Sequence, residues 1–302
     1  MSVEERPDPA PGAGELLVEA RFAGINPADL NQRAGRYPAP AGVPQDIPGL
    51  EVSGVVAATG PNVLGFSKGD RVFGIVGGGG LADRVVVHER HVTAIPDRLD
   101  DEAATAAPEA FLTAHDALFS QAGLRMGETL LVNGANGGVG TAAVQLGVAA
   151  GARVVASARS EEARGRLAEL GAEAIEPEGF AERVTADVVL ELVGSPNLDP
   201  DLEALKAKGR IVIVGTGAGA EAPLSLRKLM GKRARLFGTV LRPRPHEEKA
   251  AAVQAFAREV VPLLADGRVR PFVDRVFPAD QAAEAFDHLE EPGKFGKVLL
   301  AF

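Results

Sequence analysis

The segment Leu130-Leu-Val-Asn-Gly-Ala-Asn-Gly-Gly-Val-Gly140 runs from apolar residues through a glycine cluster toward an alanine-rich stretch. Glycine lets a backbone turn tightly and exposes main-chain N–H groups, and a helix beginning there adds partial positive charge, so such a turn can hold a pyrophosphate. The spacing is Gly134-x-x-Gly137-x-x-Gly140 rather than G-x-G-x-x-G, so an ordinary strand-to-helix connection stays open as an alternative. The pattern predicts a dinucleotide-binding turn with contacts from Asn136, Gly137, Gly138, Val139 and Gly140.

The residues around this turn alternate between short apolar runs and helical segments. Glycine closes several of the expected helices, as a left-handed cap would. Such alternation predicts βαβ units and therefore a Rossmann-type, doubly wound parallel sheet. We expect strands at 129–133, 153–156, 187–192, 211–214 and 234–240, helices at 141–150, 161–170 and 202–207, then a long helix at 247–264 and a strand at 298–301.

The first third of the chain has a different pattern, rich in glycine and proline with short apolar runs. Runs of this length between turn residues predict strands of an antiparallel, barrel-like unit. Because 302 residues are too many for one core, we expect two domains. Residues 1–108 and 248–302 are expected to form the barrel-like domain, and residues 109–247 the nucleotide-binding domain.

Composition narrows the functional classes. Hydrophobic residues make up 46% of the chain and charged residues 24%, which is ordinary for a soluble globular protein. The net charge of −9 disfavours nucleic acid as a partner, and no apolar run is long enough to span a membrane. The absence of cysteine rules out disulfides and thiolate zinc sites, and together with a start that does not resemble a signal peptide it predicts a cytoplasmic protein.

The end of the second strand, Val155-Ala-Ser-Ala-Arg-Ser160, indicates which cofactor is used. Sites that prefer NAD usually place Asp or Glu there for the ribose 2′-hydroxyl, and none is present. Arg159 can pair with a 2′-phosphate, and the hydroxyls of Ser157 and Ser160 can donate to it, so NADP(H) is favoured. Alternatively, Ser160 caps the next helix and Arg159 is solvated; both interpretations can hold together.

Ordered motifs along nearly the whole chain resemble the zinc-free quinone oxidoreductase (zeta-crystallin-like) family of the medium-chain dehydrogenase/reductases. They are Gly24-Ile-Asn-Pro-Ala-Asp29, Pro48-Gly-Leu-Glu-Val-Ser-Gly54, Gly69-Asp-Arg-Val-Phe-Gly74 and the turn at 135–140. The resemblance implies an α/β fold in which a GroES-like β-barrel catalytic domain joins the Rossmann domain. It also implies NADPH-dependent reduction of quinones or α,β-unsaturated carbonyl compounds, and a homodimer formed through the last strand of the Rossmann sheet.

Two departures from related proteins stand out. Zinc-dependent relatives hold their metal with a Cys before the first helix and a His in a Gly-His-Glu turn, where this chain has Asn26 and Leu50, with Glu51 retained. A metal-independent reaction is therefore expected. Family members also usually begin with two further strands, which raises the question of how the barrel closes here.

Candidate catalytic residues follow from the same resemblance. Tyr37, the only tyrosine, follows the Asn-Pro-x-Asp motif, where enoyl-thioester reductases of the superfamily carry a proton-donating tyrosine. A phenol stays protonated at neutral pH and can donate, although Tyr37 can instead stack on the nicotinamide or pack the loop. Asn26 can orient the substrate oxygen or the nicotinamide, or only form a turn before Pro27. Thr113 is expected near the nicotinamide carboxamide, or as a core threonine.

Further cofactor contacts are expected where the parallel strands end. They are Val193, Gly215, Thr216, Gly238 and Leu241. Arg242 and Arg244 are expected to face solvent. Two other functions stay open, an enoyl-thioester reductase and a non-catalytic NADPH-binding protein.

Overall fold

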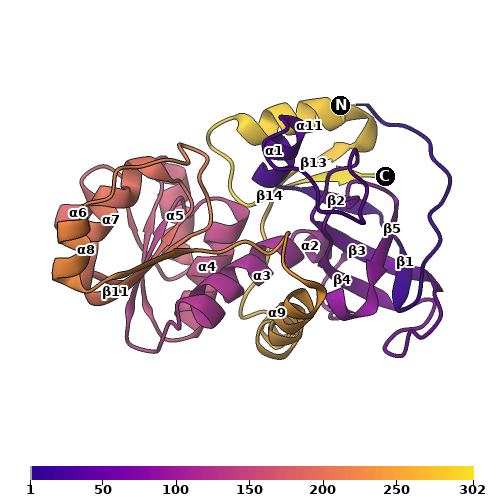
Figure 1. The fold of residues 1–302 in the computed structure, drawn as a ribbon, viewed down its shortest axis with the longest axis horizontal. Helices are drawn as coiled ribbons and strands as arrows, with labels where there is room; N and C mark the ends of the chain where they lie inside the picture. Colours follow the sequence, from indigo (N-terminus) through magenta and orange to yellow (C-terminus); the bar gives the residue numbers. More distant parts are fainter. Residues whose placement is uncertain (1) are drawn as a thin grey trace. The chain divides into compact units, whose positions relative to one another are not determined.

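A six-stranded parallel sheet carries the glycine-rich turn in the computed structural model, which describes residues 2–302 (Figure 1). Its strands are β7 (Thr129–Asn133), β8 (Arg153–Ser157), β9 (Glu173–Ile175), β10 (Ala186–Glu191), β11 (Leu205–Ile213) and β12 (Arg235–Gly238). Their order is β12-β11-β10-β7-β8-β9, and every neighbouring pair is parallel. The chain therefore winds outward from β7 in both directions, which confirms the predicted doubly wound Rossmann sheet.

Helices cover both faces of this sheet. On one face Phe180, Leu202 and Leu229 pack with strand residues such as Leu131 and Ile211. On the other face α4 packs so closely that a Cβ on Gly147 would lie 2.9 Å from the side chains of Leu130 and Val154. The helices are α4 (Gly138–Ala149), α5 (Glu161–Glu169), α6 (Phe180–Arg183), α7 (Leu198–Ala204) and α8 (Leu226–Lys232).

Two expected helices differ in the structure. The helix predicted at 202–207 ends at Ala204, and β11 begins at Leu205. The register between β10 and β11 shifts between Ala186 and Val188, so Gly209 lies in an irregular strand segment rather than capping a helix. The long helix predicted at 247–264 is two helices, α9 (His246–Glu259) and α10 (Val261–Asp266), because Pro262 has no N–H and fits only the first turn of a new helix.

The remaining strands form two sheets, which confirm the expected GroES-like architecture. An antiparallel sheet, in the order β5-β1-β3-β4-β6, surrounds a core that includes Leu16, Val52 and Val72. A second sheet, β13-β14-β2, joins the C-terminal segment to an N-terminal strand. The strands are β1 (Glu15–Glu19), β2 (Phe22–Ile25), β3 (Glu51–Thr59), β4 (Arg71–Ile75), β5 (Arg84–His88), β6 (Val92–Ala94), β13 (Val273–Pro278) and β14 (Lys297–Ala301).

Several helices accompany these two sheets. Phe286 of α11 (Ala282–Glu290) packs on the β13–β14–β2 sheet, and α1 (Pro27–Arg33) follows β2 directly. Helices α2 (Asp101–Thr105) and α3 (Pro108–His115) come later in the chain. By contact, the chain divides into unit 1, residues 1–112 and 241–302, and unit 2, residues 113–240.

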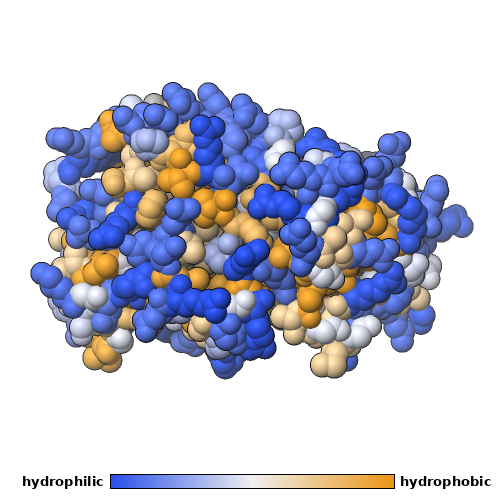
Figure 2. All heavy atoms as spheres, turned by 180° about the vertical axis from the view of Figure 1, so that it is seen from behind, coloured by the Kyte–Doolittle hydropathy of each residue, from blue (hydrophilic) through white to orange (hydrophobic). Residues whose placement is uncertain are grey.

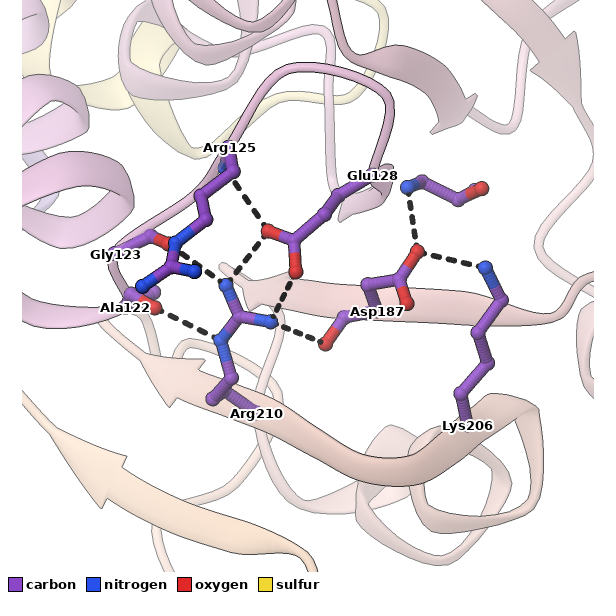
Figure 3. A network of polar contacts seen from close by, with 8 residues as sticks. Ala122, Gly123, Arg125, Glu128, Asp187, Lys206 and Arg210 are labelled. Atoms are coloured by element: carbon purple, nitrogen blue, oxygen red, sulfur yellow. Dashed lines mark hydrogen bonds and ion pairs between the residues drawn. The ribbon is translucent and has the colours of Figure 1, made fainter.

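Ion pairs connect neighbouring strands of unit 2 near their amino-terminal ends (Figure 3). Arg210 of β11 donates to both carboxylate oxygens of Glu128 at 2.8 Å, and to the carbonyl oxygens of Ala122 and Gly123. Asp187 accepts from Lys206 at 2.7 Å and from the backbone N–H of Thr129 at 2.8 Å. These two partly buried carboxylates thus each face a cation, which offsets the cost of removing their charge from water.

One face of the molecule is shown by residue hydropathy in Figure 2. On the face in Figure 2 hydrophilic residues predominate, and hydrophobic ones gather in small groups. Among residues 2–302, no helix combines the length and the apolar character needed to cross a bilayer.

Candidate cofactor site and candidate proton donor

The glycine-rich turn has the geometry that an anion needs. Gly134 lies in the left-handed region at φ 76°, and a Cβ on Gly140 would lie 2.6 Å from the backbone of Ala135, so the turn tolerates little but glycine there. Around Gly137 the space is open, because no protein atom lies within 4 Å of its Cβ position. Helix α4 begins there with no acidic residue in its first turn, and the first N–H groups of a helix have no partner within it. The backbone N–H groups at 137–140 can therefore donate hydrogen bonds to a phosphate group.

The end of β8 agrees only partly with its expected role. Ser160 caps α5 by accepting the N–H of Ala163 at 3.2 Å, which leaves its own hydroxyl able to donate. Arg159 is exposed. Ser157, however, is buried, and its hydroxyl donates to Asn133 Oδ1 at 2.9 Å, so this hydroxyl is engaged within the sheet.

A buried polar network, which sequence reasoning missed, lies at the carboxyl ends of β7 and β10. Glu191 accepts N–H groups from Val193 at 2.5 Å and Gly194 at 2.7 Å with one oxygen. Its other oxygen accepts from the side-chain amides of Asn133 at 3.0 Å and Asn197 at 3.1 Å. The sequence feature that could have revealed this network is the acid inside the apolar run Val188-Val-Leu-Glu-Leu-Val193. An acidic residue is rarely buried in a strand unless it has polar partners.

Two predicted cofactor contacts, Val193 and Gly215, lie with Gly134 around the turn that follows β10. A Cβ on Gly134 would lie 3.1 Å from the side chain of Val193, and one on Gly215 would lie 2.2 Å from Leu192 O. Thr216 follows Gly215, and Gly238 ends β12 in the same unit. Thr113 is buried in unit 2, whereas Leu241 belongs to unit 1. The structure thus brings Gly134, Val193 and Gly215 together, as the ends of parallel strands in a nucleotide-binding sheet do.

In unit 1, Asn26 and Glu51 surround a buried ammonium group. Lys297 is 5% exposed, and its Nζ donates to Glu51 Oε1 at 2.6 Å and to Asn26 Oδ1. Asn26 Nδ2 donates to the same Glu51 oxygen at 3.0 Å, while Glu51 Oε2 accepts the N–H of Glu109 at 3.0 Å. Both ends of the Asn26 amide are therefore engaged within the protein.

This arrangement does not fit a zinc ion. An amide and the apolar Leu50 stand where zinc-dependent relatives have ligands, and the Lys297 cation already neutralises Glu51. Within residues 2–302, no three His, Asp or Glu side chains are grouped so that they could hold a metal. The nearby carboxylate of Asp29 accepts N–H groups from Asn26 and Gly49, each at 2.8 Å, and burial raises the pKa of Asp29 to about 6.

Tyr37 lies against a buried arginine. The Arg242 guanidinium is 5.0 Å from the centre of the Tyr37 ring and donates to Tyr37 O at 2.9 Å, Gln32 Oε1 at 2.5 Å and Gly77 O at 2.7 Å. The expectation that Arg242 faces solvent is therefore wrong, since it is 5% exposed and each of its three guanidinium nitrogens donates to an oxygen of unit 1. Burial raises the pKa of Tyr37, whereas the positive charge of Arg242 opposes that rise. The phenol is thus protonated at neutral pH and lies beside a cation that stabilises its conjugate base.

Comparisons with known proteins place the chain in a family of dehydrogenases and reductases. Residues 12–97 match the alcohol dehydrogenase GroES-like domain, and residues 138–258 match the zinc-binding dehydrogenase family. A quinone oxidoreductase from Rattus norvegicus is 31% identical, over 97% of this chain and 90% of its own length. An acryloyl-coenzyme A reductase from Metallosphaera sedula is 30% identical, over 99% and 95%. A mycobacterial protein solved in complex with NADPH has a TM-score of 0.89 at 28% identity, over 99% and 94%.

Proposed function

This chain is an oxidoreductase of the quinone oxidoreductase family of the medium-chain dehydrogenase/reductases, and we propose that it reduces quinones or α,β-unsaturated carbonyl compounds with NADPH, without a metal. The observation that carries the proposal is the glycine turn at the end of β7. The space beside Gly137 is free for a ligand, whereas a side chain at Gly140 would collide with the backbone of Ala135. A direct test is NADPH oxidation with 1,2-naphthoquinone. Tight NADPH binding without turnover of quinones or enones would favour a non-catalytic binding protein instead.

Unit 2 supplies the groups that would bind the dinucleotide. The amides at 137–140 receive the diphosphate at the start of α4. Arg159 and the hydroxyl of Ser160 receive the 2′-phosphate, without the buried Ser157. When bound, NADPH supplies a hydride, and conjugated acceptors suit this chemistry because the resulting charge spreads onto an oxygen.

Replacing Arg159 by alanine is expected to weaken NADPH binding about 10- to 100-fold, because a charged hydrogen bond to phosphate contributes about 1.5–3 kcal/mol. NADH lacks the 2′-phosphate, so its affinity should stay unchanged and serves as the internal control. Fluorescence titration of both nucleotides gives the two dissociation constants. Equal loss for NADH and NADPH would contradict a role in 2′-phosphate recognition.

Unit 1 supplies the candidate proton donor. Charge that develops on the substrate oxygen needs a hydrogen-bond donor, and the protonated phenol of Tyr37 is suited to that task. Arg242 holds the tyrosine by its backbone oxygen and ring face, so it acts as a positioning residue. Asn26 is proposed to support this region through its contacts with Glu51 and Lys297 rather than through free amide groups.

A Tyr37→Phe variant is expected to lower kcat with an enone about 100-fold, since general acids typically contribute 10²–10⁴-fold. The ring that packs on Arg242 is kept, so NADPH affinity and thermal stability should not change. Steady-state rates across pH 6–10 provide the measurement. A rate within twofold of the parent protein would show that Tyr37 only packs or stacks.

An enoyl-thioester reductase is the second candidate, favoured by the similarity to the acryloyl-coenzyme A reductase. Comparing kcat/KM for a simple enone and for acryloyl-coenzyme A separates the two activities.

A homodimer through β12 is also proposed, because β12 is an edge strand of its sheet and edge strands pair readily. Sedimentation analysis tests the dimer, and a cytoplasmic location remains part of the proposal.

A further inference from the structure

Two buried acids meet beneath the turn that follows β10. Asp201 of α7 is 0% exposed, and Glu191 at the end of β10 is 1% exposed. Asp201 Oδ1 accepts from Asn133 Nδ2 at 2.7 Å, and the same nitrogen donates to Glu191 Oε2 at 3.0 Å, so the two carboxyl groups lie side by side. Asp201 Oδ2 has no N–H or O–H donor among residues 2–302. Two buried carboxyl groups in contact cannot both ionise at low cost, so one of them keeps a proton.

The surrounding donors show which acid holds the proton. Glu191 accepts four N–H groups, the environment of an ionised carboxylate. Asn133 cannot help Asp201 further, because its two N–H groups go to Glu191 and Asp201 and its oxygen accepts from Ser157. A proton on Asp201 Oδ2, shared with Glu191 in a hydrogen bond, gives this oxygen the partner that it otherwise lacks. Burial, followed by the charge of Glu191, raises the pKa of Asp201 to about 9.

We propose that Asp201 is a positioning residue, which keeps its proton, donates a hydrogen bond to Glu191 and thereby holds the turn at residues 192–194 in the shape that receives the dinucleotide. The cofactor part of this inference rests on the proposed function. The shared proton does not, because it follows from the contacts within unit 2.

The turn in question borders the candidate cofactor site on two sides. Val193 limits the space beside Gly134, and Leu192 O limits the space beside Gly215. Gly194, at φ 114°, lies so close to the next loop that a Cβ would be 2.5 Å from Gly219 O. Glu191 accepts the N–H groups of Val193 and Gly194. If the Glu191 side chain moved, these two residues and their contacts with the neighbouring loops would move as well.

Charged groups on the neighbouring elements are occupied elsewhere. Lys228 of α8 pairs with Asp199 and Glu203 on the outer side of α7, and Lys232 donates to backbone oxygens. Arg183 of α6 donates to the backbone oxygens of residues 176, 178 and 179. The carboxylates at the opposite end of the sheet each face a cation (Figure 3), whereas this acid pair has only amides and its own proton.

The shared proton has a measurable linkage to folding. Because the pKa of Asp201 rises from 3.8 to about 9 on folding, its contribution to stability is complete below about pH 4 and is lost as the pH rises toward 9. Asp201→Asn replaces the proton with an amide N–H and removes the titration. Urea unfolding of the nucleotide-free proteins, followed by circular dichroism at pH 6–9, gives the ratio of unfolding constants. We expect the ratio of wild type to Asp201→Asn to rise by up to tenfold per pH unit. A ratio independent of pH overturns the shared proton.

Nucleotide binding tests the positioning role. Asp201→Leu, which can neither donate nor accept, is expected to weaken NADPH binding at least tenfold at pH 7, and Asp201→Asn is expected to recover most of that loss. Unchanged affinity in a folded Asp201→Leu protein overturns the positioning role. Absence of nucleotide binding by the wild type overturns the proposed function and the positioning role with it, while the unfolding constants still decide the shared proton by themselves.

Discussion

Replacing Gly140 by alanine is expected to lower NADPH affinity at least 100-fold and to destabilise the protein by about 1–3 kcal/mol, the usual cost of forcing atoms into a packed site. The added Cβ would lie 2.6 Å from the Cα, C and O atoms of Ala135, and backbone atoms cannot move aside as a flexible side chain can. The turn must therefore open, and the amides at 137–140 would lose their common direction. Thermal unfolding and NADPH titration measure the two effects.

Gly165 provides the matched control for this substitution. It lies within helix α5, and apart from its chain neighbours and the backbone of its own helix no atom lies within 4 Å of its Cβ position. Gly165→Ala should therefore leave NADPH binding unchanged and stabilise the protein by about 0.5–1 kcal/mol through helix propensity. If Gly140→Ala bound NADPH as well as Gly165→Ala does, the shape of the turn would have no part in binding.

Replacing Lys297 by methionine is expected to destabilise the protein by about 3–5 kcal/mol, because it leaves Glu51 as a buried charge without its cation. Methionine keeps much of the length of the side chain, so the loss reports on charge more than on packing. Urea unfolding provides the measurement. The exposed Lys68 gives the control, since Lys68→Met should change stability by less than about 0.5 kcal/mol.

A double substitution separates the ion pair from general disruption. Lys297→Met combined with Glu51→Gln removes both charges, so it should be more stable than Lys297→Met alone, with a coupling of about 0.5–3 kcal/mol. Additive losses in the two single variants would show that Lys297 does not act through Glu51.

The sequence predicted the features that depend on local pattern. Alternating apolar runs and helices around the turn at 134–140 identified the parallel sheet, because both periodicities arise from the backbone itself. The end of α4, next to Gly151, and the cap at Ser160 also followed from local residue chemistry.

Long-range partners could not be predicted in the same way. Arg242 binds Tyr37, which is distant in sequence, and nothing in the prolines beside Arg242 indicates burial. Ser157 was expected at the 2′-phosphate, but Asn133 on the neighbouring strand binds its hydroxyl. Asp201 was not singled out, because its role depends on its contact with Glu191, which comes from the packing of α7 against β10. Each of these side chains has a partner that is set by the packing of another element, which the pattern of a single sequence does not show.

The most direct measurement is the NADPH dissociation constant of Gly137→Val. Gly137 has extended backbone at φ −79° and ψ 176°, which valine adopts readily, and its Cβ position is free of protein atoms. The fold should therefore keep its Tm within about 2 °C. If the diphosphate lies against the amides at 137–140, the valine side chain occupies its space, and we expect affinity to fall at least tenfold. An unchanged dissociation constant in a normally folded variant would contradict the dinucleotide site.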